Sequence, residues 1–174
     1  MISAFQGDPD RDRQEIEDLL IRYCTLVDRR DVDALVESVF ADDAVDNHGL
    51  GIWSGRIGLH EGFTWVLSRF AGTVHQITNV VITLEGDRAT SRCYVTGWHW
   101  LPHEGRERRP AGGPADFVVV GAYDDSLERR SHGWRIVHRT FRQVGHSVVG
   151  AGALPEFMDP QKRISRGGSN GTGY

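Results

Sequence analysis

Residues 12–30 read DRQEIEDLLIRYCTLVDRR, and the rest of the predicted fold is arranged around this stretch. Its apolar residues recur at helical spacing, which predicts one long helix with an apolar stripe. The stripe comprises Ile16, Leu19, Leu20, Tyr23, Leu26 and Val27. Leu20, Cys24 and Asp28 follow one another at four-residue intervals, so Asp28 continues one row of the stripe. A carboxylate at the inner edge of an apolar face needs a polar partner, because burying it alone costs on the order of several kcal/mol.

Two roles fit Asp28 equally well from its spacing. A second helix is predicted over Val32–Phe40, and Asp is a good residue to cap the start of a helix. Alternatively, Asp28 is a functional carboxylate held at the end of the first helix. The pattern within the helix does not choose between these two roles.

Composition limits the class of protein. The chain has 174 residues, a formal net charge of −4 and no block of like charges, which argues against a nucleic-acid-binding surface. Cys24 and Cys93 lie in apolar contexts and are expected to be core thiols in a reducing compartment. The first ten residues show no signal-peptide pattern, and no apolar run reaches membrane length. We therefore expect a soluble, cytoplasmic protein that binds neither nucleic acid nor membrane.

Predicted helices come first in the chain, and predicted strands follow. The helices cover residues 12–30, 32–40 and 55–70, and short strands cover 44–48 and 52–54. Longer strands cover residues 73–85, 89–101, 117–127 and 134–144. This order predicts an α+β domain over residues 12–145, with a leader at 1–11 and a partly disordered tail at 146–174. Residues 103–115 contain two prolines and three glycines and are predicted to form a long, mobile loop.

Five short motifs, taken in order, resemble the SnoaL-like family. They are residues 12–28, Phe40-Ala41-Asp42-Asp43-Ala44-Val45, His75-Gln76-Ile77-Thr78-Asn79, Gly121-Ala122-Tyr123-Asp124-Asp125 and Gly133-Trp134-Arg135-Ile136-Val137-His138-Arg139. The resemblance covers about residues 10–145 and implies the nuclear-transport-factor-2-like superfamily. Its fold is a cone-shaped, curved antiparallel or mixed sheet with three N-terminal helices that enclose a pocket. Since that fold serves dehydratases, isomerases, cyclases, epoxide hydrolases and non-catalytic subunits, it does not by itself imply one activity.

The resemblance also implies a site. Scytalone dehydratase, the bile-acid dehydratases and hexachlorocyclohexane dehydrochlorinase place an Asp at the end of the first helix and a His at the start of the first long strand. Asp28 and His75 match these positions. A Tyr on the first helix of the two dehydratases matches Tyr23, and an Arg from the closing strands of the dehydrochlorinase is nearest to Arg139. The ketosteroid isomerase pattern needs a second, protonated Asp that neither inner strand here supplies.

These residue types suit acid–base chemistry. His75 is the expected base, Asp28 would accept its other ring N–H, and Tyr23 would donate a proton or hydrogen bond. We expect the Asp28 carboxylate and a ring nitrogen of His75 to lie about 2.6–3.2 Å apart in an enclosed pocket. Strand alternation puts His138 and Arg139 on opposite faces, and both faces carry apolar residues, so the choice between them stays open.

Aromatic residues are the candidates for lining a substrate pocket, although they also fit a core or a dimer contact. They are Trp53, Phe63, Tyr94 and Trp98. Such a pocket suits a flat polycyclic or terpenoid substrate. His99 and His103 have a four-residue spacing but are joined by no cysteine or carboxylate, so no metal is expected. No phosphate loop, nucleophile elbow or CxxC pair is present, so no cofactor is expected either.

Two functions follow. The first is a cofactor-free lyase, with dehydratase-type elimination, isomerisation or cyclisation of a hydrophobic cyclic molecule such as a steroid, polyketide or terpenoid. The second is a non-catalytic binding or assembly module that resembles the small subunit of an aromatic-ring dioxygenase. In both cases the apolar outer face of the sheet predicts a homodimer or higher homo-oligomer.

Overall fold

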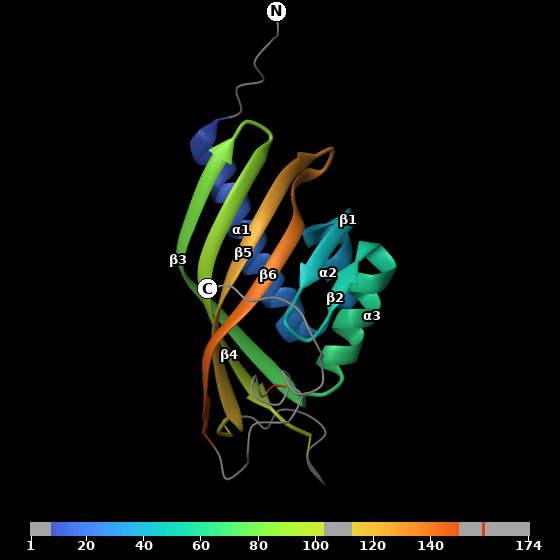
Figure 1. The fold of residues 1–174 in the computed structure, drawn as a ribbon, viewed down its shortest axis with the longest axis vertical. Coiled ribbons are helices and arrows are strands. Elements are labelled where there is room, and N and C mark those ends of the chain that lie inside the picture. The colour runs from blue at the N-terminus through green and yellow to red at the C-terminus, as the bar shows by residue number, and fades with distance from the viewer. Residues whose placement is uncertain (1–7, 103–112, 150–157, 159–174) are drawn as a thin grey trace, which may run out of the picture.

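The structure is a computed structural model, and it describes residues 8–102, 113–149 and 158 (Figure 1). In these residues the helices are α1 (Pro9–Arg29), α2 (Val32–Val39) and α3 (Gly55–Leu67). The strands are β1 (Phe40–Asn47), β2 (Ile52–Ser54), β3 (Gly72–Glu85), β4 (Arg88–Trp100), β5 (Phe117–Arg130) and β6 (Gly133–Val148). The predicted order of helices and strands is confirmed.

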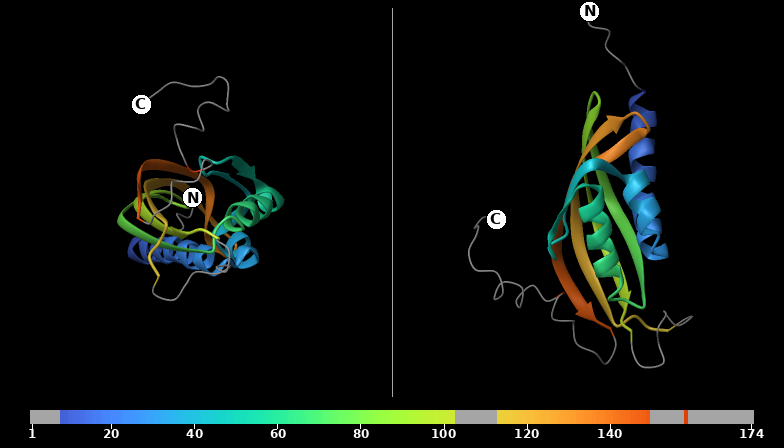
Figure 2. Two further views of the ribbon diagram at one scale, coloured as in Figure 1. Left: turned by 90° about the horizontal axis from the view of Figure 1, so that it is seen from below. Right: turned by 90° about the vertical axis from the view of Figure 1, so that its right-hand side faces the viewer.

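All of the strands form one mixed sheet in the order β2-β1-β6-β5-β4-β3. Neighbouring strands are antiparallel except for β1 and β6, which are parallel. α1 packs against β3 and β6, and α3 packs against β1 and β2. Figure 2 shows that the sheet is curved and that these helices lie against it. The predicted α+β cone, with a curved sheet and three N-terminal helices, is therefore confirmed.

The first helix begins earlier than predicted. Asp8 caps it by accepting a hydrogen bond from the backbone N–H of Asp10 at 3.1 Å, and Pro9 occupies the first turn, where its missing N–H costs nothing. Residues 9–11 therefore belong to α1 and not to a leader; residues 1–7 lie outside the described part of the chain.

The start of α2 settles the role of Asp28 as a cap. The N-cap of α2 is Asp31, whose side chain accepts a hydrogen bond from the backbone N–H of Ala34 at 3.1 Å. The capping role considered for Asp28 is therefore wrong, and its carboxylate is free for other partners.

Several other boundaries differ from the predictions. β1 begins at Phe40 and not at residue 44, and β5 ends at Arg130 and not at residue 127. α3 ends at Leu67, because the chain turns at Ser68, whose hydroxyl donates to the backbone carbonyl of Trp65 at 2.8 Å. β6 continues to Val148 because its pairing with β5 extends to the contact between Val148 and Phe117, so residues 146–148 are strand and not tail. Most of the predicted mobile loop (103–112) and of the predicted tail (150–157 and 159–174) lies outside the described residues.

A bulge between β5 and β6 decides which side chains of β6 face inward. Leu127 pairs with Ile136, but the preceding Ser126 pairs with His138, so Val137 is the extra residue. This extra residue reverses the alternation, and Arg139 becomes fully buried while His138 is exposed. Of the two residues that alternation could not separate, Arg139 is therefore the one that faces inward.

The helices and the inner face of the sheet enclose one apolar core. Cys24 and Cys93 are free thiols within it, as predicted, and burial raises the pKa of Cys24 to about 12 and that of Cys93 to about 11. Gly62 of α3 lets the indole of Trp53 lie against the helix, since a Cβ there would come 2.1 Å from the ring. Among the described helices, none is both long and apolar enough to span a membrane.

Candidate active site

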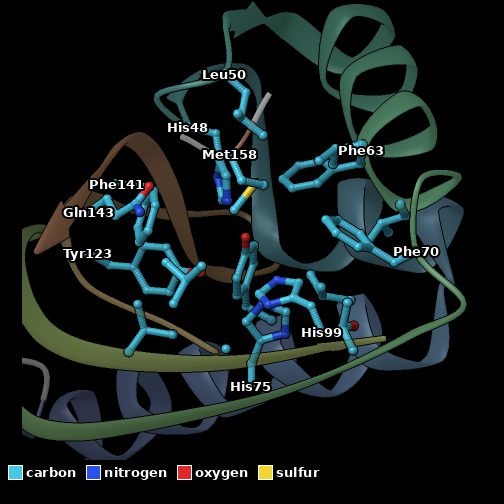
Figure 3. A pocket seen from close by; sticks show the side chains of 18 residues that line it. His48, Leu50, Phe63, Phe70, His75, His99, Tyr123, Phe141, Gln143 and Met158 are labelled. Carbon is cyan, nitrogen blue, oxygen red and sulfur yellow. The ribbon is translucent and has the colours of Figure 1, made fainter. Parts of the chain in front are cut away.

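A pocket opens between the helices and the inner face of the sheet (Figure 3). Its empty space is about 650 Å³ when the opening to solvent is included. Apolar and aromatic side chains form most of its wall, and a few polar groups converge on it. The polar and titratable residues of the wall are Tyr23, His48, Thr73, His75, His99, Tyr123 and Gln143.

His75 lines this pocket, and its ring contacts Asp28. His75 Nδ1 lies 2.7 Å from Asp28 Oδ1, within the predicted distance. The backbone N–H of His75 and the hydroxyl of Thr73 also donate to the same carboxylate, each at 2.9 Å. The side chains are only 23% and 11% exposed for Asp28 and His75, respectively. β3 therefore supplies all three of these donors and holds the carboxylate in one orientation.

This contact determines the tautomer of His75. A carboxylate only accepts hydrogen bonds, so Nδ1 carries the proton that faces Asp28. Nε2 of the neutral ring then has a free lone pair, and His75 lines the pocket. The arrangement can remove a proton from a bound molecule and stabilise the resulting imidazolium. The contact is as predicted, and the catalytic role itself stays a prediction.

Tyr23 lies in the same pocket wall and is 2% exposed. Burial raises the pKa of Tyr23 well above its ordinary value, although the charge of Arg139 partly opposes the rise. Its hydroxyl therefore keeps its proton throughout the physiological range and can act as a donor. Its ring meets those of Phe63 and Tyr123 edge-on, with centroids 6.2 and 5.6 Å away.

Arg139 lies beneath the pocket wall and not in it. Its Nε and Nη2 each donate to Asp125 at 2.7 Å, and the side chain of Arg139 is 1% exposed. Its guanidinium carbon also sits 4.0 Å from the ring centroid of Tyr23 and 4.2 Å from that of Tyr123. Burial lowers the pKa of Arg139, but the Asp125 carboxylate outweighs this effect and holds the pKa well above its ordinary value. The geometry supports a positioning role toward the two tyrosines, and the catalytic role that the resemblance implied for Arg139 stays a prediction.

Of the four aromatic residues predicted to line the pocket, one does so in the structure. Phe63 lines the pocket, and Trp53 lies behind the wall, stacked on His48 with ring centroids 5.8 Å apart. Tyr94 and Trp98 do not line it, because they alternate with Val95 and Gly97 and so point to the outer face of the sheet. Their predicted place in the pocket is therefore wrong.

His99 also faces the pocket and was considered only as a metal ligand. Its ring stacks on Phe117 with centroids 4.6 Å apart and meets His75 edge-on at 5.7 Å. Burial, together with the charges of His75 and His48, lowers the pKa of His99 to about 3. His99 is thus neutral at physiological pH. Its proposed partner His103 lies outside the described residues, within which no group of three His, Cys, Asp or Glu side chains is placed to hold a metal ion.

Sequence reasoning missed a second histidine–carboxylate contact in the pocket. His48 Nδ1 lies 3.4 Å from both carboxylate oxygens of Asp46, and Asp46 is fully buried. One signal was available: residues two apart on a strand share a face, so a strand ending in Asp46-Asn47-His48 places the acid and the imidazole side by side.

Comparisons with known proteins agree with this fold. The sequence profile of the SnoaL-like domain matches residues 11–140. An uncharacterized protein of Mycobacterium tuberculosis is 33% identical over 131 residues, which cover 74% of this chain and 82% of the relative. A proposed aromatic ring hydroxylase from Novosphingobium aromaticivorans is 31% identical, with a TM-score of 0.68 over 82% of this chain and 96% of the other. The hexachlorocyclohexane dehydrochlorinase LinA-type3 from Novosphingobium barchaimii is 23% identical, with a TM-score of 0.69 over 85% and 98% of the two chains, and shares the fold.

Proposed function

The chain belongs to the SnoaL-like family within the nuclear transport factor 2-like superfamily, and on this premise we propose that it is a lyase that needs no cofactor. Its substrate is a hydrophobic cyclic molecule with a carbonyl group, and the reaction is a dehydratase-type elimination. The observation that carries the proposal is the 2.7 Å contact between Asp28 and His75, which leaves Nε2 of His75 free in an aromatic pocket. Related isomerisations and cyclisations begin with the same proton transfer.

The proposed chemistry begins at His75. Nε2 takes a proton from the carbon next to the substrate carbonyl, and Asp28 stabilises the imidazolium that forms. Tyr23 donates a hydrogen bond to the oxygen that gains negative charge. The aromatic walls exclude water and favour a flat ring system.

A bicyclic β-hydroxyketone tests this proposal. β-Hydroxytetralone has an acidic proton beside a carbonyl and a hydroxyl on the next carbon, and its dehydration gives a naphthol that absorbs in the near ultraviolet. The wild-type protein should accelerate this reaction, and His75→Ala should abolish most of the acceleration. His60→Ala is the matched control, because His60 contacts Asp33 at 3.0 Å on the surface, away from the pocket. The proposal would be contradicted if the protein turned over neither this compound nor any member of a screen of hydroxylated steroids, polyketides and terpenoids.

A second candidate function is a non-catalytic assembly or binding module. The resemblance to the small subunit of an aromatic-ring dioxygenase favours it, and the chain is also 31% identical to a proposed aromatic ring hydroxylase. This candidate requires no chemistry from His75, so His75→Ala would leave association with a partner unchanged. Loss of turnover on His75→Ala therefore separates the two candidates.

A further inference from the structure

The pocket contains two histidine–carboxylate contacts, and they differ in how the carboxylate is satisfied. Asp28 receives two neutral donors in addition to the His75 ring, namely the Thr73 hydroxyl and the His75 backbone N–H. Asp46 has no such support: within the described residues, His48 is the side chain with which it shares a hydrogen bond or ion pair. Asp46 is also 0% exposed, whereas the Asp28 side chain is 23% exposed.

These surroundings favour different charge states for the two imidazoles. A fully buried carboxylate is costly unless a positive charge pairs with it, so Asp46 favours the protonated form of His48. The His48 ring is also stacked between Trp53 and Phe141, with centroids 5.8 and 5.2 Å away, and aromatic faces attract a cation. The neutral donors around Asp28 already satisfy its charge and leave His75 free to be a neutral base. Two like groups in unlike surroundings are a common origin of an acid–base pair.

Among the other charged and titratable groups around His48, none takes the place of Asp46 as the negatively charged partner of the His48 ring. Tyr23 and Tyr123 are buried phenols with raised pKa values, and they stay neutral. His99 is neutral as well, because its pKa is lowered to about 3. Arg139 lies opposite Asp46 on the neighbouring strand. Its Nε and Nη2 are bound to Asp125, and its Nη1 and the Oδ2 atom of Asp46 have no hydrogen-bond partner among the described residues.

We propose that His48, oriented by Asp46, is the general acid of the reaction and protonates the leaving hydroxyl group. Figure 3 shows His48 and His75 reaching the cavity from opposite sides. His48 is partly accessible, at 16% exposure, and with Nδ1 turned toward Asp46 its Nε2 is the atom available to a ligand. This inference rests on the proposed function, since it assigns the second half of the same elimination.

The proton balance of the step is complete. His75 Nε2 accepts the proton from the carbon beside the carbonyl, and the electrons of that C–H bond form the new C=C bond. The C–O bond to the hydroxyl breaks, its electron pair stays on oxygen, and the His48 Nε2 proton converts that oxygen to water. His75 ends protonated and His48 neutral, and exchange with solvent water restores both.

A pair of substrates that differ only in the leaving group tests the assignment. Acetate leaves as a stable anion without protonation, so β-acetoxytetralone needs the base but not the acid. His48→Gln should slow dehydration of β-hydroxytetralone on the order of 10²–10⁴-fold and leave acetate elimination nearly unchanged, whereas His75→Ala should slow both.

Each outcome separates the two claims. If the wild type catalyses elimination from neither compound, the proposed function is wrong, and the assignment of His48 as the general acid is wrong with it. If both reactions occur but His48→Gln affects them equally or not at all, His48 is not the acid while His75 keeps its role. His60→Gln is the control for the substitution, and both of its rates should match the wild type.

A measurement without substrate guards against misfolding of the variants. Side-chain nitrogen NMR of the wild-type protein should show a proton on Nδ1 of His48, which faces Asp46, and Asp46→Asn should change that signal while the signals of His75 stay the same. A His48 Nδ1 without a proton in the folded wild type would overturn the proposal.

Discussion

The carboxylate of Asp28 lies 2.7 Å from the Nδ1 atom of His75, although 47 residues separate the two in the chain. α1 packs against β3, and Asp28 in the last turn of the helix lies beside the first residues of the strand. The contact supports an orienting role for Asp28 and a basic role for His75.

The Asp28 and His75 side chains should act as one unit in the chemical step. His75→Ala should lower the single-turnover rate on the order of 10²–10⁴-fold, because it removes the general base. Asp28→Asn should cost a comparable factor, since an amide can favour the wrong tautomer, while thermal unfolding shows that the fold survives. The double variant should be little worse than His75→Ala alone. An Asp28→Asn enzyme with full rate would assign the site to another base.

The Tyr23 hydroxyl should contribute less than the base. Tyr23→Phe keeps the ring and its edge-on contacts and removes only the donor, which water can partly replace. Its effect on the same single-turnover rate should therefore be smaller than that of His75→Ala. Tyr94→Phe is the control, since Tyr94 is 46% exposed on the outer face and its variant should keep the full rate. Equal losses in the two tyrosine variants would contradict the role of Tyr23.

His99 should make the protein less stable in acid. Its pKa is about 3 in the folded protein against an ordinary value of 6.5, so between these values the unfolded chain binds more protons than the folded one. Stability therefore falls as pH drops below 6.5, by at most about 1.4 kcal/mol per pH unit, and the loss ends near the folded value. The free energy of unfolding in urea should be measured near neutral pH and at about pH 5. The difference between the two values should be smaller for His99→Gln than for the wild type.

Another acid-sensitive group does not disturb that comparison. Arg129 donates to Asp12 and is the largest cause of the lowered pKa of Asp12, whose ordinary value is 3.8. A lowered carboxyl pKa stabilises the fold above the ordinary value, and this contribution is lost only as pH falls toward the folded value. The Asp12 effect thus lies below the range in which His99 is measured. An unchanged pH dependence in His99→Gln would show that His99 is not the group responsible.

Removing only one member of the buried ion pair between Arg139 and Asp125 should lower the free energy of unfolding substantially. Arg139→Met leaves the Asp125 carboxylate buried without its cation, which costs about 3–5 kcal/mol of unfolding free energy. Replacing both, as in Arg139→Met with Asp125→Leu, should recover part of that loss in urea titrations. The exposed pair of Arg142 and Asp124 is the control, and Arg142→Met should cost about 0–1 kcal/mol. Similar losses in the two single variants would contradict this account.

The outer face of the sheet is the surface on which we propose that two copies associate. Three apolar or aromatic side chains are exposed there: Val81 at 63%, Tyr94 at 46% and Val120 at 39%. They lie on β3, β4 and β5, which pair with one another in that order. Light scattering at micromolar concentration should give the mass of a dimer, and Val120→Glu should shift it toward the monomer. Ile57→Glu, on the exposed side of α3, should leave the mass unchanged. A monomeric wild type under these conditions would rule out the interface.

The sequence alone determined the elements and the floor of the site. Helical spacing located α1, and the change to strand-like composition after it located β3 to β6, because both signals depend on residues near one another in the chain. The interruption of an apolar row by Asp28, joined to the family resemblance at His75, was enough to predict the contact between them. Cys24 and Cys93 were assigned to the core for the same local reason.

Only the tertiary structure decided which side chains share the pocket. One extra residue at Val137 turned Arg139 inward and His138 outward, and such a bulge leaves no periodic signal because it depends on how β6 pairs with β5. Pairing also set Tyr94 on the outer face, and it was the packing of Trp53 and Phe141 around His48 that made an unremarked histidine a candidate acid. A side chain's chemistry follows from its partners, and in this protein those partners come from strands far apart in sequence.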